Sequence, residues 1–149
     1  MIKSSARTKR KNRMIKALDA ACRAEVVEIR DRNYCQRCGA QDGEWIKEHQ
    51  RYVKIQWAHV HTREYYITRW EPDNSLALCD CCHVWFDHHK VLSYEWFRKR
   101  WTERWEHIQN VLRVSTKTSE AWIRAKYEEM KADPPSVCVS GTISDDLPF

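Results

Sequence analysis

The chain is poor in glycine and has no long apolar run. Three of its 149 residues are glycine and 32% are charged, a composition that favours a helix-rich protein over a β-barrel. No apolar stretch is long enough to span a bilayer. The basic N-terminus lacks the apolar core and small-residue cleavage site of a secretory signal. We therefore expect a cytoplasmic protein of one modest domain with extensions and no membrane partner.

Acidic residues are absent from a basic cluster near the N-terminus, and the whole chain has a formal charge of +5. A dense cationic segment favours a polyanionic partner, of which nucleic acid is the simplest. The alternative is a solvated, frayed terminus. We expect five side chains of this cluster to contact DNA: Lys9, Arg10, Lys11, Arg13 and Lys16.

Seven cysteines in a cytosolic chain favour metal binding over disulfide bonds. Four of them form two CxxC pairs, the spacing of a tetrahedral structural zinc site: Cys35, Cys38, Cys79 and Cys82. Gly39 allows the backbone to turn tightly beneath the first pair. Cys81 lies inside the second pair and could replace one of its neighbours, although the two-residue spacing favours Cys79 with Cys82.

Apolar spacing predicts several helices and a small amount of strand. The expected helices cover about residues 13–30, 79–92, 93–112 and 119–131, and the expected strands cover 51–57 and, more weakly, 65–68. Ser93 is a plausible N-cap of the third of these helices. Residues 1–12 are expected to be disordered.

A histidine, an asparagine and a second histidine occur in that order around the cysteine pairs. His59 lies at the end of a strand, Asn74 in a later loop, and His83 directly after Cys82. This order in a double-CxxC frame, over roughly residues 35–100, resembles the HNH endonucleases. It is most similar to small phage-encoded HNH proteins and, more loosely, to NinG-like recombination endonucleases.

The resemblance implies an α+β fold with a zinc-stabilised ββα-metal (HNH) core and flanking helices. The chain then divides into a basic N-terminal arm and helix (1–34), the HNH core (35–92), C-terminal helices (93–132) and a flexible acidic tail (133–149). Its function would be metal-dependent DNA endonuclease activity, with nicking as the default, in DNA processing or recombination.

The resemblance also implies roles for four residues. His59 would be the general base that takes a proton from the attacking water, because a neutral imidazole suits that task near pH 7. Asn74 would brace the loop and orient the His59 ring. His83 would bind a single Mg²⁺ or Mn²⁺ ion at the scissile phosphate. Arg63 is the best-placed cation for the charge of the transition state.

Ala58 departs from the family pattern, in which an Asp or His just before the base often binds the catalytic metal. Either Asp87 or His61 completes the site, or His83, phosphate and water hold the ion weakly, or activity is lost. If activity is lost, the protein would be a non-catalytic zinc DNA-binding or adaptor protein.

The last five residues resemble the acidic tip of bacterial single-stranded-DNA-binding proteins: Asp145, Asp146, Leu147, Pro148 and Phe149. In that family the tip docks on repair and replication proteins, so the resemblance implies a host protein partner. A further alternative for the whole chain is therefore an inhibitor of a host DNA-processing enzyme that acts through this tail.

Overall fold

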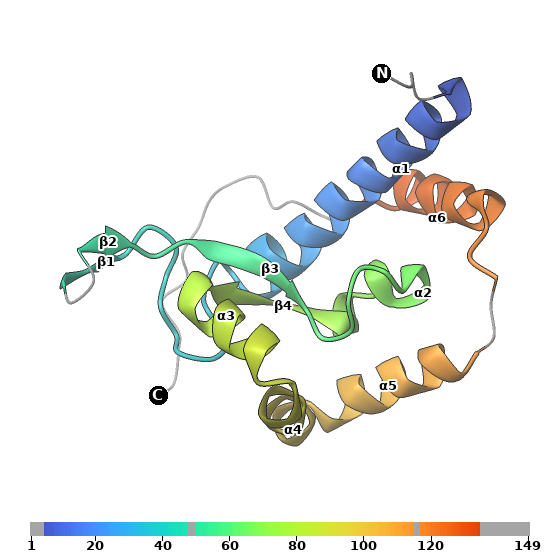
Figure 1. Cartoon of the computed structure of the whole chain (residues 1–149). Coiled ribbons are helices and arrows are strands. Elements are labelled where there is room, and N and C mark those ends of the chain that lie inside the picture. Colours follow the sequence, from blue (N-terminus) through green and yellow to red (C-terminus); the bar gives the residue numbers. More distant parts are fainter. Residues whose placement is uncertain (1–4, 48–49, 115–116, 135–149) are drawn as a thin grey trace.

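The computed structural model describes residues 5–47, 50–114 and 117–134. The helices are α1 (Ala6–Arg23), the π-helix η1 (Ala24–Arg30), α2 (Tyr66–Arg69), the 3-10 helix η3 (Pro72–Asn74), α3 (Asp80–His88), α4 (Lys90–Arg100), α5 (Thr102–Arg113) and α6 (Glu120–Ala132). The strands are β1 (Trp45–Ile46), β2 (Arg51–Tyr52), β3 (Ile55–His59) and β4 (Ser75–Cys79). The expected α+β class is confirmed (Figure 1).

The antiparallel pair β3–β4 is the centre of the fold. Its register runs from Ile55 opposite Cys79 to His59 opposite Ser75. Both η1 and α3 contact the two strands, and Figure 1 shows the pair between the end of α1 and α3. Every residue of β4 is buried, which explains why its sequence is apolar instead of alternating.

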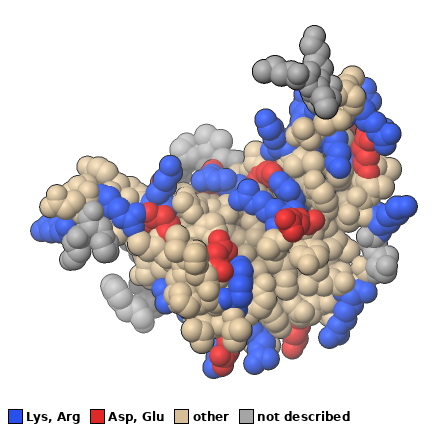
Figure 2. Space-filling model, in the orientation of Figure 1, with Lys and Arg blue, Asp and Glu red and all other residues tan. Residues whose placement is uncertain are grey.

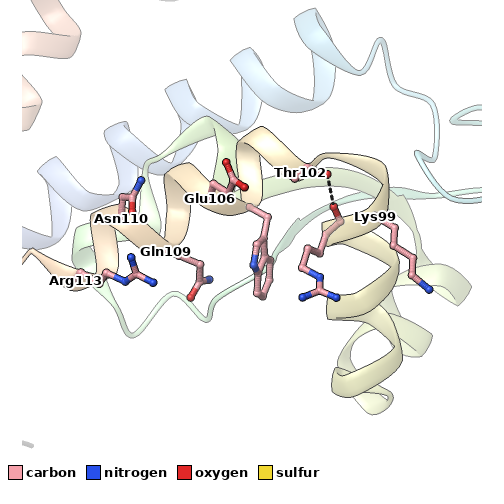
Figure 3. A pocket seen from close by; sticks show the side chains of 8 residues that line it. Lys99, Thr102, Glu106, Gln109, Asn110 and Arg113 are labelled. Carbon is pink, nitrogen blue, oxygen red and sulfur yellow. Dashed lines mark hydrogen bonds between the residues drawn. The ribbon is translucent and has the colours of Figure 1, made fainter.

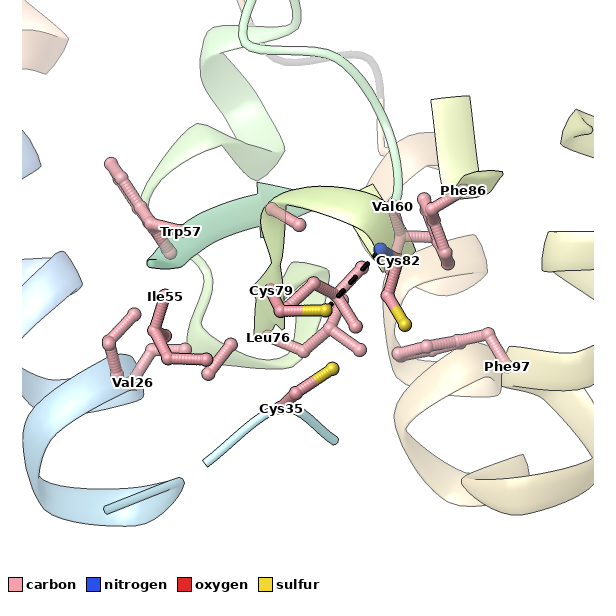
Figure 4. Packing of buried hydrophobic residues seen from close by; sticks show 14 of the residues in the cluster. Val26, Cys35, Ile55, Trp57, Val60, Leu76, Cys79, Cys82, Phe86 and Phe97 are labelled. Atoms are coloured by element: carbon pink, nitrogen blue, oxygen red, sulfur yellow. Dashed lines mark hydrogen bonds between the residues drawn. The ribbon is translucent and has the colours of Figure 1, made fainter. Parts of the chain in front are cut away.

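Two hydrophobic clusters stabilise the fold. The larger one surrounds β3–β4, and Figure 4 shows Val26 with Ile55 on one side of the strands and Phe86 with Phe97 on the other. The smaller cluster joins α1 to α6, and its buried members are Met14, Leu18 and Ile123. The N-terminal and C-terminal helices therefore pack on each other, apart from the strands.

The first helix begins earlier than expected. Ser5 is its N-cap, because the Ser5 Oγ accepts a hydrogen bond from the Thr8 N–H at 3.2 Å. Residues 6–12 are therefore helical, and the expectation of disorder there was wrong. The front of the apolar stripe, at Met14 and Leu18, packs on α6 and not on the cysteine-rich segment.

Two further expectations were wrong. Residues 65–68 form most of a short helix instead of a strand, with the Thr68 N–H donating to the Tyr65 carbonyl at 3.1 Å. The expected 93–112 helix starts at Lys90 and is broken at Trp101, whose φ is −136°. Ser93 is no cap: it is buried inside α4 and its hydroxyl donates to the Phe86 carbonyl at 3.0 Å.

The last helix agrees with expectation, because the Ser119 Oγ caps α6 by accepting from the Trp122 N–H at 3.3 Å. The predicted tip at residues 145–149 lies outside the described residues. Within the ranges given above, no helix combines the length and the apolar character needed to cross a membrane.

Candidate functional site

The four paired cysteines meet at one point. Their Sγ atoms all lie within 4.8 Å of one another, and the Cys38 and Cys79 sulfurs are 3.7 Å apart. A tetrahedral ion with Zn–S bonds of about 2.3 Å separates its sulfurs by about 3.8 Å, so this donor set can hold a metal such as zinc. Cys81 is exposed and outside the cluster, where its sulfur accepts from Arg51. The structure therefore brings together the four cysteines of the predicted ligand set.

The first cysteine pair lies on a tight turn that is fastened to the strands. Gly39 has φ +77°, in the left-handed region that favours glycine, and its N–H donates to the Cys35 carbonyl at 2.8 Å. The Gln36 N–H donates to the Ala77 carbonyl of β4 at 2.9 Å. In Figure 4 the sulfurs of Cys35, Cys79 and Cys82 face the same space. The turn and β4 thus form one metal-binding unit.

The protonation of the cluster is uneven. A hydrogen bond from Cys82 lowers the pKa of Cys35, while burial raises the pKa of Cys79. Because a metal cation is bound by thiolates, binding of a cation to thiols that are protonated must release protons. The Arg37 guanidinium lies 3.6 Å from the Cys82 sulfur and can balance part of the charge of four thiolates.

His59 ends β3 and is almost buried, with 8% of its surface exposed. Its ring packs on Trp57 with centroids 4.2 Å apart, and its Nε2 lies 3.3 Å from the Arg69 carbonyl. A carbonyl can only accept, so Nε2 carries the proton and Nδ1 keeps its lone pair. Burial and the nearby Arg63 lower the pKa of His59 to about 4, so the ring is neutral at pH 7.

Asn74 is fully buried and closes the loop between β3 and η3. Its Oδ1 accepts from the His61 N–H at 2.9 Å, and its Nδ2 donates to the carbonyls of His61 and Thr68, both at 3.0 Å. The expected bracing of the loop is therefore present. Asn74 does not bond to the His59 ring, which donates instead to the Arg69 carbonyl.

His83 lies in α3 between a polar partner on each side. Its Nδ1 is 2.6 Å from the Gln56 Oε1, and its Nε2 is 3.4 Å from the Asp87 Oδ2. Burial lowers the pKa of His83, Asp87 opposes that shift, and Arg63 adds to it. His61, the other residue considered as a ligand of the catalytic metal, has its Nε2 bonded to Gln109 of α5 at 3.2 Å.

A hollow of about 370 Å³ lies where four segments of the chain meet. Its lining residues come from α1, β3, the following loop and α3: Asp19, Ala20, Arg23, Gln56, Trp57, Arg63 and His83. Arg63 lies over the Trp57 ring at 5.2 Å and lowers the pKa of both His59 and His83. His59 does not line the hollow but contacts Trp57, which does.

The sequence did not single out Asp19, which fastens this site to α1. Its carboxylate accepts two hydrogen bonds from Arg69, at 2.9 and 2.7 Å, and one from the Trp70 indole at 2.8 Å. Burial alone would raise the pKa of Asp19, but these hydrogen bonds outweigh it and lower the pKa. Asp19 is the first acidic residue of the chain, and that isolation among cations was the available signal.

The five basic residues predicted to contact DNA separate into two groups. Lys9, Arg13 and Lys16 are exposed, and their spacing of three and four puts them on one stripe of α1 that leads to Arg23 in the hollow. Lys11 is half-buried over the Tyr66 ring, and Arg10 borders a separate surface hollow with Glu120 of α6. Figure 2 shows basic side chains along α1 and across the middle of the same face.

A larger hollow of about 640 Å³ lies where α4 meets α5. Figure 3 shows Gln109 and Arg113 on one side of α5 with Lys99 on α4. None of the residues predicted for catalysis lines it.

Comparisons with protein-family models, with curated proteins and with solved structures find no match to this chain. Its function must therefore be argued from the geometry of the described residues.

Proposed function

We propose that this protein is a metal-dependent DNA endonuclease of the HNH type, which hydrolyses a phosphodiester and nicks one strand. The observation that carries the proposal is that Arg63 and His83 line one hollow with Trp57, on whose ring His59 packs. The four-cysteine cluster fixes this arrangement, because Cys79 ends β4 and Cys82 directly precedes His83.

The proposed base is His59. Its Nε2–H is engaged by the Arg69 carbonyl, so the free lone pair on Nδ1 is the group that can take a proton from water. Its low pKa keeps it unprotonated at neutral pH. Arg63 would contact the phosphate and balance the negative charge that develops there.

The proposed divalent ion would be held by His83 and Asp87, whose Nε2 and Oδ2 are 3.4 Å apart. An imidazole with a carboxylate is a donor pair that suits Mn²⁺ and also accepts Mg²⁺, with positions left for phosphate and water. The ion would supply charge stabilisation at the leaving oxygen. Ala58 is fully buried and offers no ligand, so the site depends on Asp87.

The basic stripe of α1 supports DNA as the substrate. From Lys9 to Arg23 it covers about 21 Å of helix axis at 1.5 Å per residue. One strand of B-DNA presents a phosphate about every 3.4 Å along its axis, so the stripe is as long as about six phosphate spacings and offers four basic side chains over that length. It leads to the hollow that contains Arg63 and His83.

A non-catalytic zinc DNA-binding or adaptor protein is the second candidate. It is favoured by the 8% exposure of His59 and by the absence of this residue from the lining of the hollow. Such a protein would use the same cysteine cluster and the same stripe. It would bind DNA without cutting it.

A plasmid-nicking assay with zinc-loaded protein tests the proposal. Wild type should nick supercoiled plasmid when Mn²⁺ or Mg²⁺ is added, and His59→Ala and His83→Ala should lose about 10²- to 10⁴-fold in rate, as expected for loss of a general base or a metal ligand. His88→Ala is the matched control, because His88 is exposed on the same helix as His83. Equal zinc content and melting temperature would show that the variants are folded. Wild type that binds the plasmid but never nicks it would establish the second candidate.

A further inference from the structure

The short β1–β2 hairpin carries an exposed aromatic pair. Trp45 and Tyr52 are partners across the two strands, with ring centroids 4.9 Å apart and ring planes at 62°. The exposed fractions are 47% for Trp45 and 66% for Tyr52. Figure 1 shows this hairpin at the end of an arm that projects away from the helices. Two large rings are therefore exposed to solvent.

Two lysines flank the aromatic pair in the sequence. Trp45 and Tyr52 are paired in the two-residue strands, on the face opposite Ile46. Lys47 and Lys54 lie just outside these strands, each two positions after one of the rings, and both are exposed whereas Ile46 and Val53 are not. Ile46 packs against the main core, and Val53 is buried. The hairpin thus anchors its apolar side chains and exposes two aromatic rings and two cations.

Hydrogen bonds and an ion pair hold the described part of the hairpin to the rest of the chain. The Gly43 N–H donates to the Val53 carbonyl at 2.9 Å, and the Val53 N–H donates to the Glu44 carbonyl at 2.7 Å. At its base, the Ile55 N–H donates to the Asp42 carboxylate at 2.8 Å. Arg51 pairs with Asp80 at the start of α3. Because the rings are held in position, little conformational entropy is lost when a ligand binds.

We propose that the β1–β2 hairpin binds an unpaired segment of a nucleic-acid strand, with bases stacked on Trp45 and Tyr52 and phosphates at Lys47 and Lys54. This inference rests on the nucleic-acid binding of the proposed function, but not on catalysis. Aromatic rings stack on the faces of unpaired bases, and these faces are covered in a duplex. The preferred DNA would therefore have single-stranded character next to the duplex that lies along α1.

The simpler role for such a pair is to stabilise a two-residue ribbon through cross-strand contact. That role needs apolar contact but no aromatic face, so leucine at position 45 would retain much of it. Base stacking needs a ring, so phenylalanine would retain binding and leucine would not. The two roles therefore predict different outcomes for two substitutions at one position.

The test is fluorescence anisotropy with a labelled thymidine oligonucleotide and with a duplex of the same length. It uses the full-length, zinc-loaded protein at fixed salt without Mg²⁺ or Mn²⁺. Trp45→Leu and Tyr52→Leu should each weaken single-strand binding by about 5- to 150-fold, the loss expected for one stacked base. Trp45→Phe should stay close to wild type, and duplex affinity should change by less than about threefold, since phosphate contacts dominate it. Tyr34→Leu, at another exposed ring, is the control.

Leucine variants that bind the oligonucleotide like wild type would overturn the inference. So would a phenylalanine variant that binds as weakly as the leucine variant, because binding would then not follow the ring. A wild type that fails to nick plasmid while these losses appear would refute the nuclease and leave the hairpin site standing. If wild type nicks plasmid but the leucine variants keep their single-strand affinity, the hairpin site is refuted and the nuclease stands.

Discussion

Replacing Asn74 with alanine should lower the melting temperature of the protein substantially. The side chain is fully buried and makes three hydrogen bonds to the backbone of His61 and Thr68. Alanine would remove the side-chain partner of the His61 N–H and of the His61 carbonyl, while the Thr68 carbonyl would keep only its bonds from backbone N–H groups such as that of Glu71 at 3.2 Å. At about 1 kcal/mol of net stability for each hydrogen bond, the loss is about 3 kcal/mol. For a chain of this length that corresponds to a decrease in Tm of about 6–12 °C.

The assay is thermal unfolding followed by circular dichroism, with zinc held in excess so that loss of metal does not contribute. Asn110→Ala is the matched control, because Asn110 is exposed on α5 and the same change there should stay within about 0.5 kcal/mol. If Asn74→Ala melts together with wild type, then this side chain does not hold the loop. The bracing role assigned to Asn74 would then be refuted.

A second substitution at the same position checks the polarity of these contacts. Asn74→Asp keeps the acceptor for the His61 N–H but turns a carboxylate oxygen towards the two carbonyls. Burial and those carbonyls should raise the pKa of the introduced carboxyl above its unfolded value of about 3.9. The protonated form then favours folding, so the deficit relative to wild type should be smaller at pH 5 than at pH 8. A deficit that is equal at both values would contradict the assigned direction of the hydrogen bonds.

Three further predictions concern other parts of the molecule. Cys79→Ser should reduce bound zinc and stability while Cys81→Ser changes neither, measured by metal analysis and unfolding; equal zinc in the two variants would contradict the ligand set. The pKa of His59 is lowered to about 4, so the unfolded chain binds its proton first and about 2 kcal/mol of stability should be lost between pH 7 and pH 5. Urea unfolding at pH 7 and pH 5 should show a smaller decrease in the free energy of unfolding for His59→Gln than for wild type. Deleting residues 147–149 should abolish binding to a repair enzyme that docks the tip of single-stranded-DNA-binding proteins, and equal affinity with and without them would refute that resemblance.

Features set by neighbouring residues could be predicted from the sequence. The spacing within each CxxC pair identified the four cysteines that meet, because two intervening residues allow both thiols of a pair to face one point. Ser119 marked the start of α6 because capping depends on the next few residues alone. The same local signal at Ser93 was wrong, since the chain had already entered α4 at Lys90.

Features that depend on distant contacts could not be predicted. The first turn of α1 pairs with α6 through Arg7 and Glu120, and no periodicity in the N-terminal segment indicates that partner. Tyr65 to Thr68 have the composition of a strand, but this short segment turns into a helix beside Asp19, which bonds to Arg69. The contribution of α1 to the hollow that contains His83 could not be predicted either, because it depends on contacts between segments far apart in the sequence.

If the four cysteines hold zinc, the separation of the two hydrophobic clusters has a consequence for protein from which the metal is removed. The packing of α1 on α6 depends on its own buried side chains and not on the four paired cysteines. The basic stripe of α1 should therefore remain in place when a chelator removes the metal. His83 adjoins Cys82 and has no such independence. On the proposed function, metal-free protein would still bind DNA but could not cut it. It would then compete with metal-bound protein for the same DNA. Zinc supply would then decide whether added protein accelerates cleavage or blocks it.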